Sequence, residues 1–374
     1  MITTSQHRRL WFLAPASLLA AFVAGCGGDG GGGAPPAGTE TAPAVIGGPS
    51  APSGPIKLMF ITNSNADWWN AVEKGMQDGA QAFQVQAEMR RNEGSTQGQI
   101  NLLQTALSLP DIQGVAVSVI EAEAPGVIDA MKELRKAGKV VIAIDSDVAP
   151  SAADARLAYI GTDNVKAGEA AGRAAAAVRP AGGKTVVFVG TSSAANARER
   201  SEGFFKGAGA PFGGKSLETF DDGGDHGKAA TNVQNAVTKY PDLGVLLGLW
   251  SYNAPAIAEE VGKSPELRKK ASVVTFDLDE AAVGHLEKGN IDVTVCQNPY
   301  EMGFQGVKAL KAFILNDKAM VESVLPDGKT RETGVRVIVP KADSPVFKNK
   351  EKGDDVITIE EMKAWLASKG LKSS

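Results

Sequence analysis

From Ile56 onward the chain alternates between short apolar runs and longer segments whose apolar residues recur every three or four positions. Such runs are typical of buried strands, and such segments are typical of amphipathic helices. The predicted strands cover residues 56–62, 85–89, 114–119, 140–144, 157–160, 185–189, 244–249, 273–276, 291–295 and 333–339. The predicted helices cover residues 68–83, 98–109, 124–137, 165–178, 196–208, 228–239, 255–261, 280–288, 300–315 and 359–368.

Uninterrupted apolar strands separated by helices indicate parallel sheets with helices on both faces. So many strands are a large number for one sheet, and the roughly 320 residues after Pro55 suit two domains of ordinary size. The sequence therefore predicts an α/β protein with two doubly wound parallel-sheet lobes. In open sheets of this kind ligands bind beyond the carboxyl ends of the strands, so the residues that follow each strand are the candidates for a site.

Residues 1–25 have the pattern of an export signal, with a basic start followed by an almost wholly apolar run over residues 10–23. The ending Ala24-Gly25-Cys26 resembles a bacterial lipoprotein signal, which implies cleavage before Cys26 and a diacylglycerol anchor on its thiol. A membrane-spanning helix needs about 20 apolar residues, more than this run supplies. An ordinary cleaved signal stays open as an alternative. In either case the mature chain is expected outside the cytoplasm, and the lipid on Cys26 would hold it at a membrane.

Residues 26–55 are mostly Gly, Pro, Ala, Ser and Thr, with no apolar period and almost no charge. Such a segment buries too little surface to offset the entropy lost on ordering, so we expect a flexible tether. A Gly-rich coil of this length has a reach of about 30 Å. The tether would therefore hold a folded body away from a membrane surface.

Composition excludes several classes of function. The formal charge is −4, or −6 once Arg8 and Arg9 leave with the signal, and no stripe of Lys and Arg suggests nucleic acid as a partner. With Cys26 lipidated, Cys296 has no partner for an intramolecular disulfide. The two remaining histidines, His226 and His285, have no metal-ligand spacing, so we expect neither a metal nor a cofactor.

Aromatic and polar side chains gather directly after the predicted strands. The candidates are Asn65, Trp68, Trp69, Asp145, Arg200, Trp250, Asn253, Phe276, Asp277 and Gln297. A saccharide presents apolar C–H faces, which aromatic rings can cover, and hydroxyl groups, which pair with carboxylate, amide and guanidinium groups. This combination of side chains favours a small saccharide or polyol as the ligand.

Six segments carry sequence motifs. They are the pair Trp68-Trp69, the strand end at Asp145, Tyr159-Ile160-Gly161-Thr162-Asp163-Asn164, Ala197-Arg198-Glu199-Arg200-Ser201-Glu202-Gly203-Phe204, Val273-Val274-Thr275-Phe276-Asp277 and Val295-Cys296-Gln297-Asn298-Pro299. In this order, and over about Ile56 to Val339, the chain resembles the periplasmic sugar-binding proteins of ABC transporters, of the ribose- and galactose-binding type.

The resemblance implies roles for individual residues. Arg200 would contact sugar oxygens, Asp145 and Asp277 would bind hydroxyls, and Gln297 would be a further ligand residue. The Trp68-Trp69 pair would sandwich the sugar ring, with Phe276 lining the site. Because two adjacent residues at the start of a helix point in different directions, a core position for one tryptophan stays open.

The resemblance also implies how the chain divides into lobes. The first lobe would hold residues 56–160 and 298–325, and the second would hold residues 161–297 and 326–340. The third crossing between them is expected near Pro326-Asp327. Residues 341–374 would form a tail with one short helix, to which the sequence assigns no role.

The chain departs from the ribose-binding pattern in three places. Ser146 and Asp147 follow Asp145 where ribose binders have arginine, the Asp221–Asp225 loop lacks the expected aromatic residue, and Trp250-Ser251-Tyr252-Asn253 is richer in aromatic residues. These departures argue against ribose itself and leave the wider class of sugar-like ligands.

The sequence thus predicts a monomeric solute-binding lipoprotein, not an enzyme, that delivers a small saccharide or polyol to an ABC permease. A sensor that presents its ligand to a chemoreceptor or kinase is an alternative, since only the partner would differ. A glycosidase is a second alternative, because Asp145 and Asp277 could supply the two carboxylates that such an enzyme needs.

Overall fold

The computed structural model describes residues 54–350 and 355–374. The predicted signal peptide, the predicted lipidation site Cys26 and all but the last two residues of the predicted tether lie outside these ranges. Within them, no helix is both long enough and apolar enough to cross a membrane.

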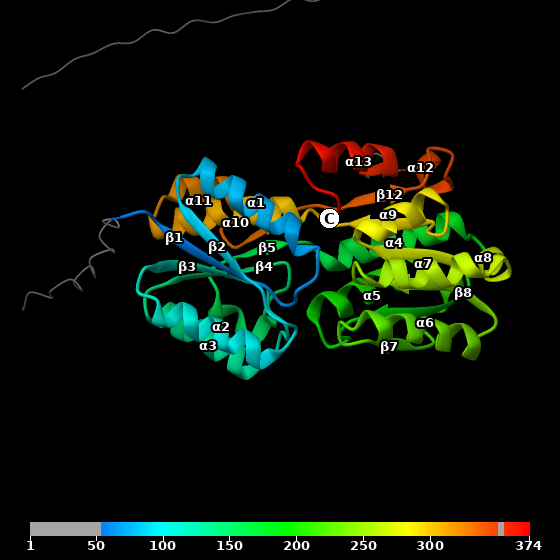
Figure 1. Ribbon diagram of the computed structural model, residues 1–374, viewed down its shortest axis with the longest axis horizontal. Helices are drawn as coiled ribbons and strands as arrows, with labels where there is room; N and C mark the ends of the chain where they lie inside the picture. The colour runs from blue at the N-terminus through cyan, green and yellow to red at the C-terminus, as the bar shows by residue number, and fades with distance from the viewer. Residues whose placement is uncertain (1–53, 351–354) are drawn as a thin grey trace, which may run out of the picture. The chain divides into compact units, whose positions relative to one another are not determined.

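The first lobe is built on a six-stranded sheet in which every pairing is parallel (Figure 1). Its strand order is β11-β5-β4-β3-β1-β2. The strands are β1 (Lys57–Ile61), β2 (Gln86–Arg90), β3 (Ile112–Val117), β4 (Val140–Ile144), β5 (Tyr159–Gly161) and β11 (Thr330–Glu332).

The second lobe is built on a seven-stranded sheet of order β13-β12-β10-β9-β8-β6-β7, parallel except for the antiparallel pair β10–β12. The strands are β6 (Lys184–Val189), β7 (Thr219–Asp221), β8 (Leu243–Gly248), β9 (Ser272–Phe276), β10 (Val293–Cys296), β12 (Arg336–Val339) and β13 (Val356–Thr358). The predicted fold class, two doubly wound parallel-sheet lobes, is confirmed.

Helices cover both faces of the first sheet because successive strand residues point to opposite sides. In β1, Leu58 and Phe60 pack into one apolar core, while Met59 and Ile61 pack into another. The first core is closed by α1 (Trp69–Ala82), α10 (Pro299–Ile314) and α11 (Lys318–Val324). The second is closed by α2 (Thr96–Ser108) and α3 (Pro125–Lys136), beside a 3₁₀ turn over Pro150–Ala155.

The second sheet is covered in the same way. One face packs against α4 (Asn164–Val178), α5 (Ala195–Ala208) and α12 (Pro345–Lys348), with a 3₁₀ turn at Ala210–Phe212. The other face packs against α6 (His226–Lys239), α7 (Asn253–Lys263), α8 (Pro265–Lys270), α9 (Glu280–Glu287) and α13 (Ile359–Ser368).

The C-terminal part of the chain corrects the expected division into lobes. Thr330–Glu332 pairs with β5 of the first sheet, so the third crossing follows Glu332 and does not lie at Pro326-Asp327. Residues beyond 340 extend the second lobe, because β13 pairs with β12 and Ile359, Met362 and Leu366 are buried in its core. The predicted helix over residues 359–368 matches α13.

Glycines allow α4 and α5 to pack with their backbones in close contact. A Cβ atom on Gly172 would lie 2.1 Å from the carbonyl oxygen of Phe204, and one on Gly207 would lie 2.1 Å from that of Glu169. Both distances are far below van der Waals contact, so a side chain there must push the helices apart. Because Arg200 is in α5, this packing also fixes the position of its Cα atom.

We expect Gly172→Ala to lower the free energy of unfolding by about 1–3 kcal/mol, the range for overpacking in a dense core. The matched control is Gly284→Ala in α9, where an added Cβ meets no atom within 4 Å. That control should raise stability by about 0.5–1 kcal/mol, because alanine is the better helix former. Urea unfolding of both variants measures the difference, and a stabilising Gly172→Ala would contradict the packing argument.

Candidate functional site

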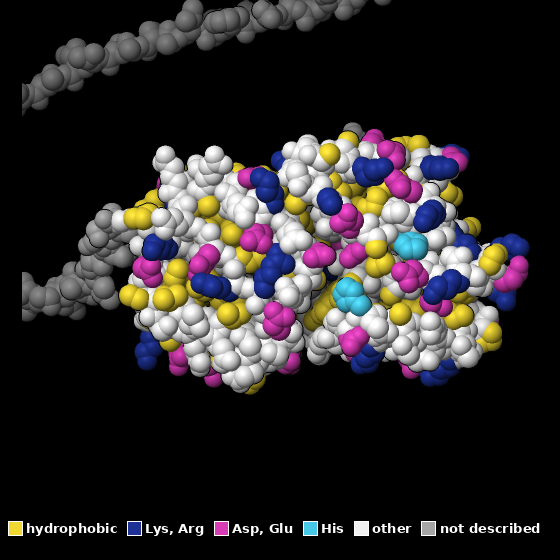
Figure 2. All heavy atoms as spheres, viewed as in Figure 1, with side chains coloured by type: hydrophobic (Ala, Val, Ile, Leu, Met, Phe, Trp, Pro, Cys, Tyr) yellow, Lys and Arg dark blue, Asp and Glu magenta, His cyan; other side chains and the backbone are white. Residues whose placement is uncertain are grey.

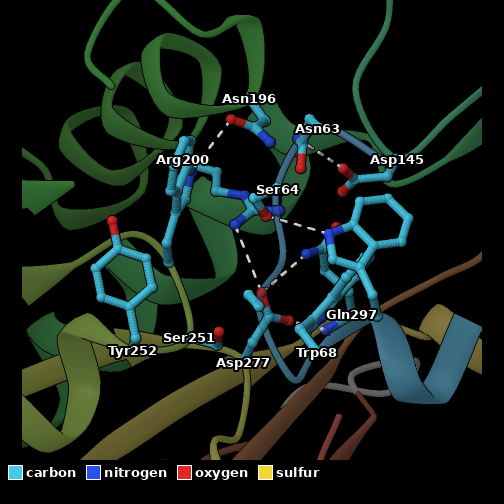
Figure 3. Close-up of a pocket in the computed structure, with 13 residues that line it drawn as sticks. Asn63, Ser64, Trp68, Asp145, Asn196, Arg200, Ser251, Tyr252, Asp277 and Gln297 are labelled. Carbon is cyan, nitrogen blue, oxygen red and sulfur yellow. Dashed lines mark hydrogen bonds and ion pairs between the residues drawn. The ribbon is translucent and has the colours of Figure 1, made fainter. Parts of the chain in front are cut away.

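The carboxyl ends of strands from both sheets meet at a cavity of about 410 Å³, including its mouth toward solvent (Figure 3). The cavity is lined by Asn63, Ser64, Ala66, Trp68, Trp69, Asp145, Asn196, Arg200, Trp250, Ser251, Tyr252, Asp277 and Gln297. The lining comes from both lobes, so the cavity depends on their relative position. Figure 2 shows the molecular surface, where the face between the lobes is hollowed and charges of both signs are scattered around it.

Two aspartates occupy equivalent places in the two lobes, directly after β4 and β9. Asp145 has φ = 59° and Asp277 has φ = 60°, values that residues other than glycine rarely adopt. Left-handed backbone of this kind persists only where the surroundings hold it, and it gathers at functional sites. Each turn ends a buried strand abruptly and places a carboxylate at the cavity.

Of the two buried carboxylates, Asp145 has the weaker set of hydrogen-bond and charged partners. Its Oδ2 atom accepts a hydrogen bond from the Ser118 hydroxyl at 2.7 Å and a weaker one from the Asn63 amide at 3.4 Å. No ion pair to Asp145 is formed by the described residues. Burial raises the pKa of Asp145 to about 6, against the lowering effects of Ser118 and of the more distant Arg200.

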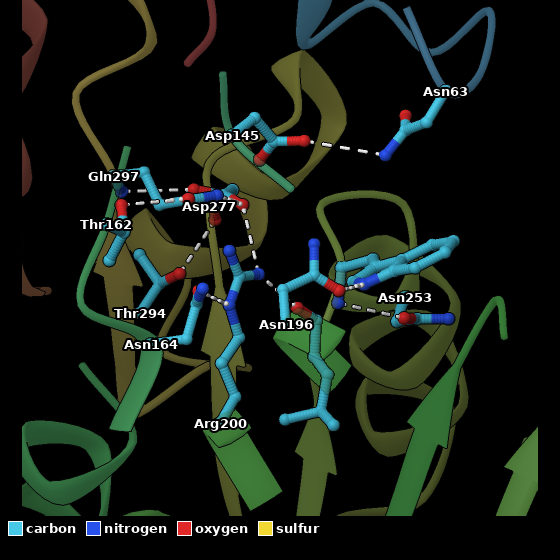
Figure 4. Close-up of polar contacts among 12 residues, drawn as sticks. Asn63, Asp145, Thr162, Asn164, Asn196, Arg200, Asn253, Asp277, Thr294 and Gln297 are labelled. Carbon is cyan, nitrogen blue, oxygen red and sulfur yellow. Dashed lines mark hydrogen bonds and ion pairs between the residues drawn. The ribbon is translucent and has the colours of Figure 1, made fainter. Parts of the chain in front are cut away.

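Asp277 is held by Gln297, which follows β10. The Gln297 backbone N–H donates to Oδ1 at 3.0 Å, and its side-chain amide donates to Oδ2 at 2.9 Å. The side-chain oxygen of Gln297, Oε1, in turn accepts from the Thr162 hydroxyl at 2.9 Å (Figure 4). Burial raises the pKa of Asp277, while Arg200, Gln297 and the Trp68 N–H oppose that rise. Of the segments that cross between the lobes, the one at Gln297 is thus bonded directly to this carboxylate, and the one at Thr162 is linked to it through Gln297.

Arg200 is almost fully buried and is fixed on three sides. Its Nε atom donates to Asn164 Oδ1 at 3.0 Å, and its Nη1 atom donates to the Leu249 carbonyl at 2.7 Å. The guanidinium lies 4.7 Å from the centre of the Phe276 ring, and Nη1 is 3.7 Å from Asp277 Oδ2. Its Nη2 atom is buried and has no partner among the described residues. Because buried donors are almost always paired, this N–H group is available for a ligand.

Trp68 and Trp69 both line the cavity, and they meet edge to face with ring centres 5.0 Å apart. The Trp69 N–H donates to the Ser64 hydroxyl at 3.2 Å. The Trp68 N–H is buried and forms no hydrogen bond among the described residues, although it lies close enough to Asp277 to lower the pKa of that carboxyl. Arg200 Nη2 likewise has no partner among the described residues. Both rings also pack into the first-lobe core, so a core position and a cavity position are not exclusive here.

Trp250 lies at the second-lobe side of the cavity, where its position depends on a glycine. A Cβ on Gly190 would lie 2.1 Å from the Trp250 ring, so the ring rests directly on backbone. The indole N–H donates to Asn196 Oδ1 at 3.3 Å, and the Trp250 backbone N–H donates to Asn253 Oδ1 at 3.1 Å.

The loop that carries Trp250 is anchored on a buried carboxylate. Asp222 accepts hydrogen bonds from the Tyr252 hydroxyl and, at 2.9 Å, from the Asn253 amide. The Tyr252 ring stacks on His226 with centres 4.9 Å apart. Asp222 thus holds the Trp250 loop, while its neighbours Asp221 and Asp225 accept hydrogen bonds from Ser192 and from the N-terminus of α6. The described residues hold no cluster of His, Cys, Asp and Glu suited to a metal ion.

Comparison with known proteins identifies the family. A family model for the periplasmic binding protein domain matches residues 56–318. The chain belongs to the periplasmic binding protein family. The D-ribose/D-allose-binding protein of Pseudomonas aeruginosa is 24% identical to this periplasmic binding protein over 253 residues, which make up 63% of this chain and 76% of that protein.

Solved structures agree with this fold. An ABC transporter solute-binding protein from Burkholderia graminis, in complex with D-arabinose, has a TM-score of 0.69 at 24% identity and covers 81% of this chain and 99% of its own. The glucose-galactose binding protein GanP of Geobacillus stearothermophilus has a TM-score of 0.68 at 24% identity, covering 77% and 98%. A solute-binding protein of Agrobacterium vitis with bound D-fucose also reaches 0.68, at 22% identity, covering 79% and 100%.

Seven of the ten candidate residues line the cavity of this periplasmic binding protein: Trp68, Trp69, Asp145, Arg200, Trp250, Asp277 and Gln297. The other three lie outside the lining. Asn65 is exposed and its amide faces Glu93 at 3.4 Å, because the loop turns it away from the cavity. Asn253 and Phe276 lie behind the lining, where they support Trp250 and Arg200.

Six lining residues were not among the candidates: Asn63, Ser64, Ala66, Asn196, Ser251 and Tyr252. Asn63 and Ser64 are closer than Asn65 to the end of β1 at Ile61, and ligands bind beyond the carboxyl ends of the strands, so their positions favoured them over Asn65. Asn196 precedes Arg200 by one helical turn and therefore shares its face of α5, a spacing that could have indicated it.

The buried carboxyl of Asp145 should make the ligand-free protein less stable as pH rises. Its pKa in the folded protein, about 6, exceeds the ordinary 3.8, so the folded state binds more protons between these values. Stability is then fully present below about pH 4 and is lost as pH rises through 6, by about 3 kcal/mol in total. Asp145→Asn should remove this loss and be the more stable protein at pH 8.

The measurement is urea unfolding of both proteins at pH 4, 5, 6 and 8. Asp111→Asn serves as the control, because Asp111 is exposed and its pKa is lowered, chiefly by Lys57, so it stays ionised from pH 5 upward. Parallel stability curves for wild type and Asp145→Asn would show that Asp145 is hydrated in solution.

Proposed function

We propose that this protein is an extracytoplasmic solute-binding lipoprotein that captures a monosaccharide or small polyol between its lobes and delivers it to an ABC permease. The observation that carries the proposal is the set of unsatisfied groups at one cavity. Arg200 Nη2 and Trp68 Nε1 are buried donors without partners, and they share the cavity with the carboxylates of Asp145 and Asp277.

These groups match a molecule with several hydroxyls. A hydroxyl both donates and accepts, so one ligand can accept from the two N–H groups and donate to the two carboxylates. Hydrogen bonds to charged groups are the stronger ones, which favours Asp145, Asp277 and Arg200 as the groups that fix ligand orientation. The rings of Trp68, Trp69 and Trp250 offer apolar surface to the C–H faces of a sugar.

The named ligands of related proteins support this class. The relatives and solved structures compared above are named for, or were solved with, ribose, allose, arabinose, glucose, galactose or fucose. All of these are monosaccharides. By the resemblance, Ser146 stands where ribose binders have arginine, so a sugar other than ribose is expected.

Ligand binding would favour the closed arrangement of the lobes. Asp145 and Trp68 belong to the first lobe, whereas Arg200 and Asp277 belong to the second. A ligand that bridges them binds the closed state better than the open state and shifts the population toward it. A permease that distinguishes the closed state would then receive loaded protein.

An enzymatic role has less support. The relatives named above are binding and transport proteins rather than enzymes. Asp277 is already occupied by two hydrogen bonds from Gln297, which suits a fixed acceptor better than a group that must transfer protons. A sensor would use the same site, and no feature of the described residues favours it over transport.

A thermal-shift screen against pentoses, hexoses, polyols and inositols tests the ligand class. A true ligand at a hundredfold excess over its Kd stabilises the folded protein by about 2.7 kcal/mol. The chain from Ala51 onward is suitable, because it forms one compact unit. If no compound of the panel raised the melting temperature, that result would contradict the proposal.

Arg200→Ala should raise the Kd for the ligand found in that screen by about 10- to 150-fold, because it removes the free Nη2 donor and a charged hydrogen bond. Arg198→Ala is the matched control, since Arg198 is exposed and donates only to the Ser193 carbonyl. Calorimetry measures both, alongside unfolding of the ligand-free variants. Equal losses would mean that Arg200 does not contact the ligand.

Cys26→Ser should block lipid attachment, so that the precursor stays uncleaved or the product leaves the membrane fraction. Electrophoresis and fractionation of cells that express the full chain provide the measurement. If the variant migrates and fractionates as wild type does, the lipoprotein part of the proposal is wrong.

A further inference from the structure

The last residues of the chain return to the ligand site. After α13 the chain runs back toward the region between the lobes, and Ser374 is completely buried (Figure 1). The Leu278 N–H donates to the Ser374 carbonyl at 2.7 Å, and the Ser374 N–H donates to the Leu278 carbonyl at 2.9 Å. Leu278 follows Asp277 directly, so the tail is bonded to the loop that holds a cavity carboxylate.

The Asp277 loop needs such support because its backbone conformation is unfavourable. Asp277 has φ = 60°, which costs free energy unless neighbouring structure fixes it. Its N–H donates to the Val295 carbonyl at 2.9 Å, and its own carbonyl accepts from the Thr294 hydroxyl at 2.7 Å. Both of these contacts come from β10. The pair of bonds to Ser374 is the contact that fixes the following residue.

The other end of the same segment contacts the first lobe. The Lys369 ammonium lies 4.4 Å from the centre of the Tyr300 ring. Tyr300 is in α10, immediately after the crossing at Gln297-Asn298, and its hydroxyl donates to Asp78 of α1 at 2.9 Å. Residues 369–374 follow α13 of the second lobe, and through Lys369 they contact Tyr300, whose hydroxyl is bonded to the first lobe.

We infer that residues 369–374 form a strap that positions Asp277 for the ligand and, through Lys369 and Tyr300, stabilises the closed arrangement of the lobes. The strap would act on the site proposed above, so its effect on affinity rests on that proposed function. Ser374 and Lys369 are positioning residues, because neither lines the cavity. Opening of the lobes should separate Lys369 from Tyr300 while leaving Ser374 on Leu278.

The first test compares two lysines of the strap. Lys369→Gln removes the cation over Tyr300 and should raise the Kd about two- to fivefold, the range for a partly exposed contact of this kind. Lys372→Gln is the matched control, because Lys372 is exposed and faces Glu280 within the second lobe at 3.5 Å. Calorimetry with the sugar identified by the screen measures both. Equal Kd values for the two variants would overturn the coupling to the first lobe.

The second test does not need a ligand. Deletion of residues 371–374 should speed hydrogen exchange at the amides of Asp277 and Gln297 at least tenfold in the ligand-free protein. The amide of Asp145, which donates to Ile160 in the first lobe, should keep its rate and report that the fold is intact. Unchanged exchange at Asp277 and Gln297 would overturn the positioning role.

Together the two tests separate the inference from the function on which it rests. If no sugar binds the wild-type protein, the proposed function fails, while the exchange rates still decide whether the strap holds the Asp277 loop. If a sugar binds and the deletion leaves both Kd and exchange unchanged, the strap is overturned and the proposed function stands.

Discussion

The buried guanidinium of Arg200 is the group on which the site depends. It is 1% exposed and is the only Lys or Arg side chain in the cavity lining among the described residues. A buried charge is tolerable only with close partners. Here the partners come from four places: Asn164 at the first crossing, the Leu249 carbonyl after β8, the Phe276 ring at the end of β9, and Asp277. If any of these four partners moved, the buried guanidinium would lose part of its compensation. The guanidinium therefore favours one arrangement of the second-lobe residues at the cavity.

That arrangement depends in turn on how closely two helices approach. Arg200 lies on α5 and Asn164 begins α4; their side chains form a 3.0 Å hydrogen bond, and the two helices pack almost backbone to backbone. Glycines supply the space: a Cβ on Gly168 would lie 2.3 Å from the Arg200 carbonyl. The first lobe repeats this solution between α1 and α10, where a Cβ on Gly303 would lie 2.0 Å from the Val72 carbonyl. In each lobe, the helix that begins just after a crossing segment (α4 or α10) is thus held in place by close packing against a neighbouring helix.

The sequence predicted the long elements well because each has its own hydrophobic pattern. The three strands it missed, β7, β11 and β13, have three residues each and are largely exposed or half-buried, so they form no apolar run. Assignment of β11 to the first sheet depends on pairing with Tyr159–Gly161, far away in the sequence, which no local pattern encodes. In the site, Asp145 and Asp277 were identifiable from motifs at strand ends, and Arg200 from a motif in the helix that follows β6. Asn65 lies outside the cavity lining because local turns set the direction of a loop side chain, which the sequence does not show. Asn196 was missed because its position in the lining comes from sharing a helix face with Arg200.

The cost of the empty site explains why a ligand can control the lobes. With the lobes together and no ligand, two buried N–H groups lack partners, and an unpaired buried polar group costs about 1–3 kcal/mol. The Asp145 and Asp277 carboxyls add a desolvation cost, which the raised pKa of each reflects. When the lobes separate, water can satisfy all four groups. A polyhydroxylated ligand satisfies them inside the cavity, so it removes the penalty that otherwise opposes closure. Under the proposed function, the groups that would recognise the ligand are therefore also the groups that oppose closure of the unliganded protein, so affinity and gating would have one physical origin.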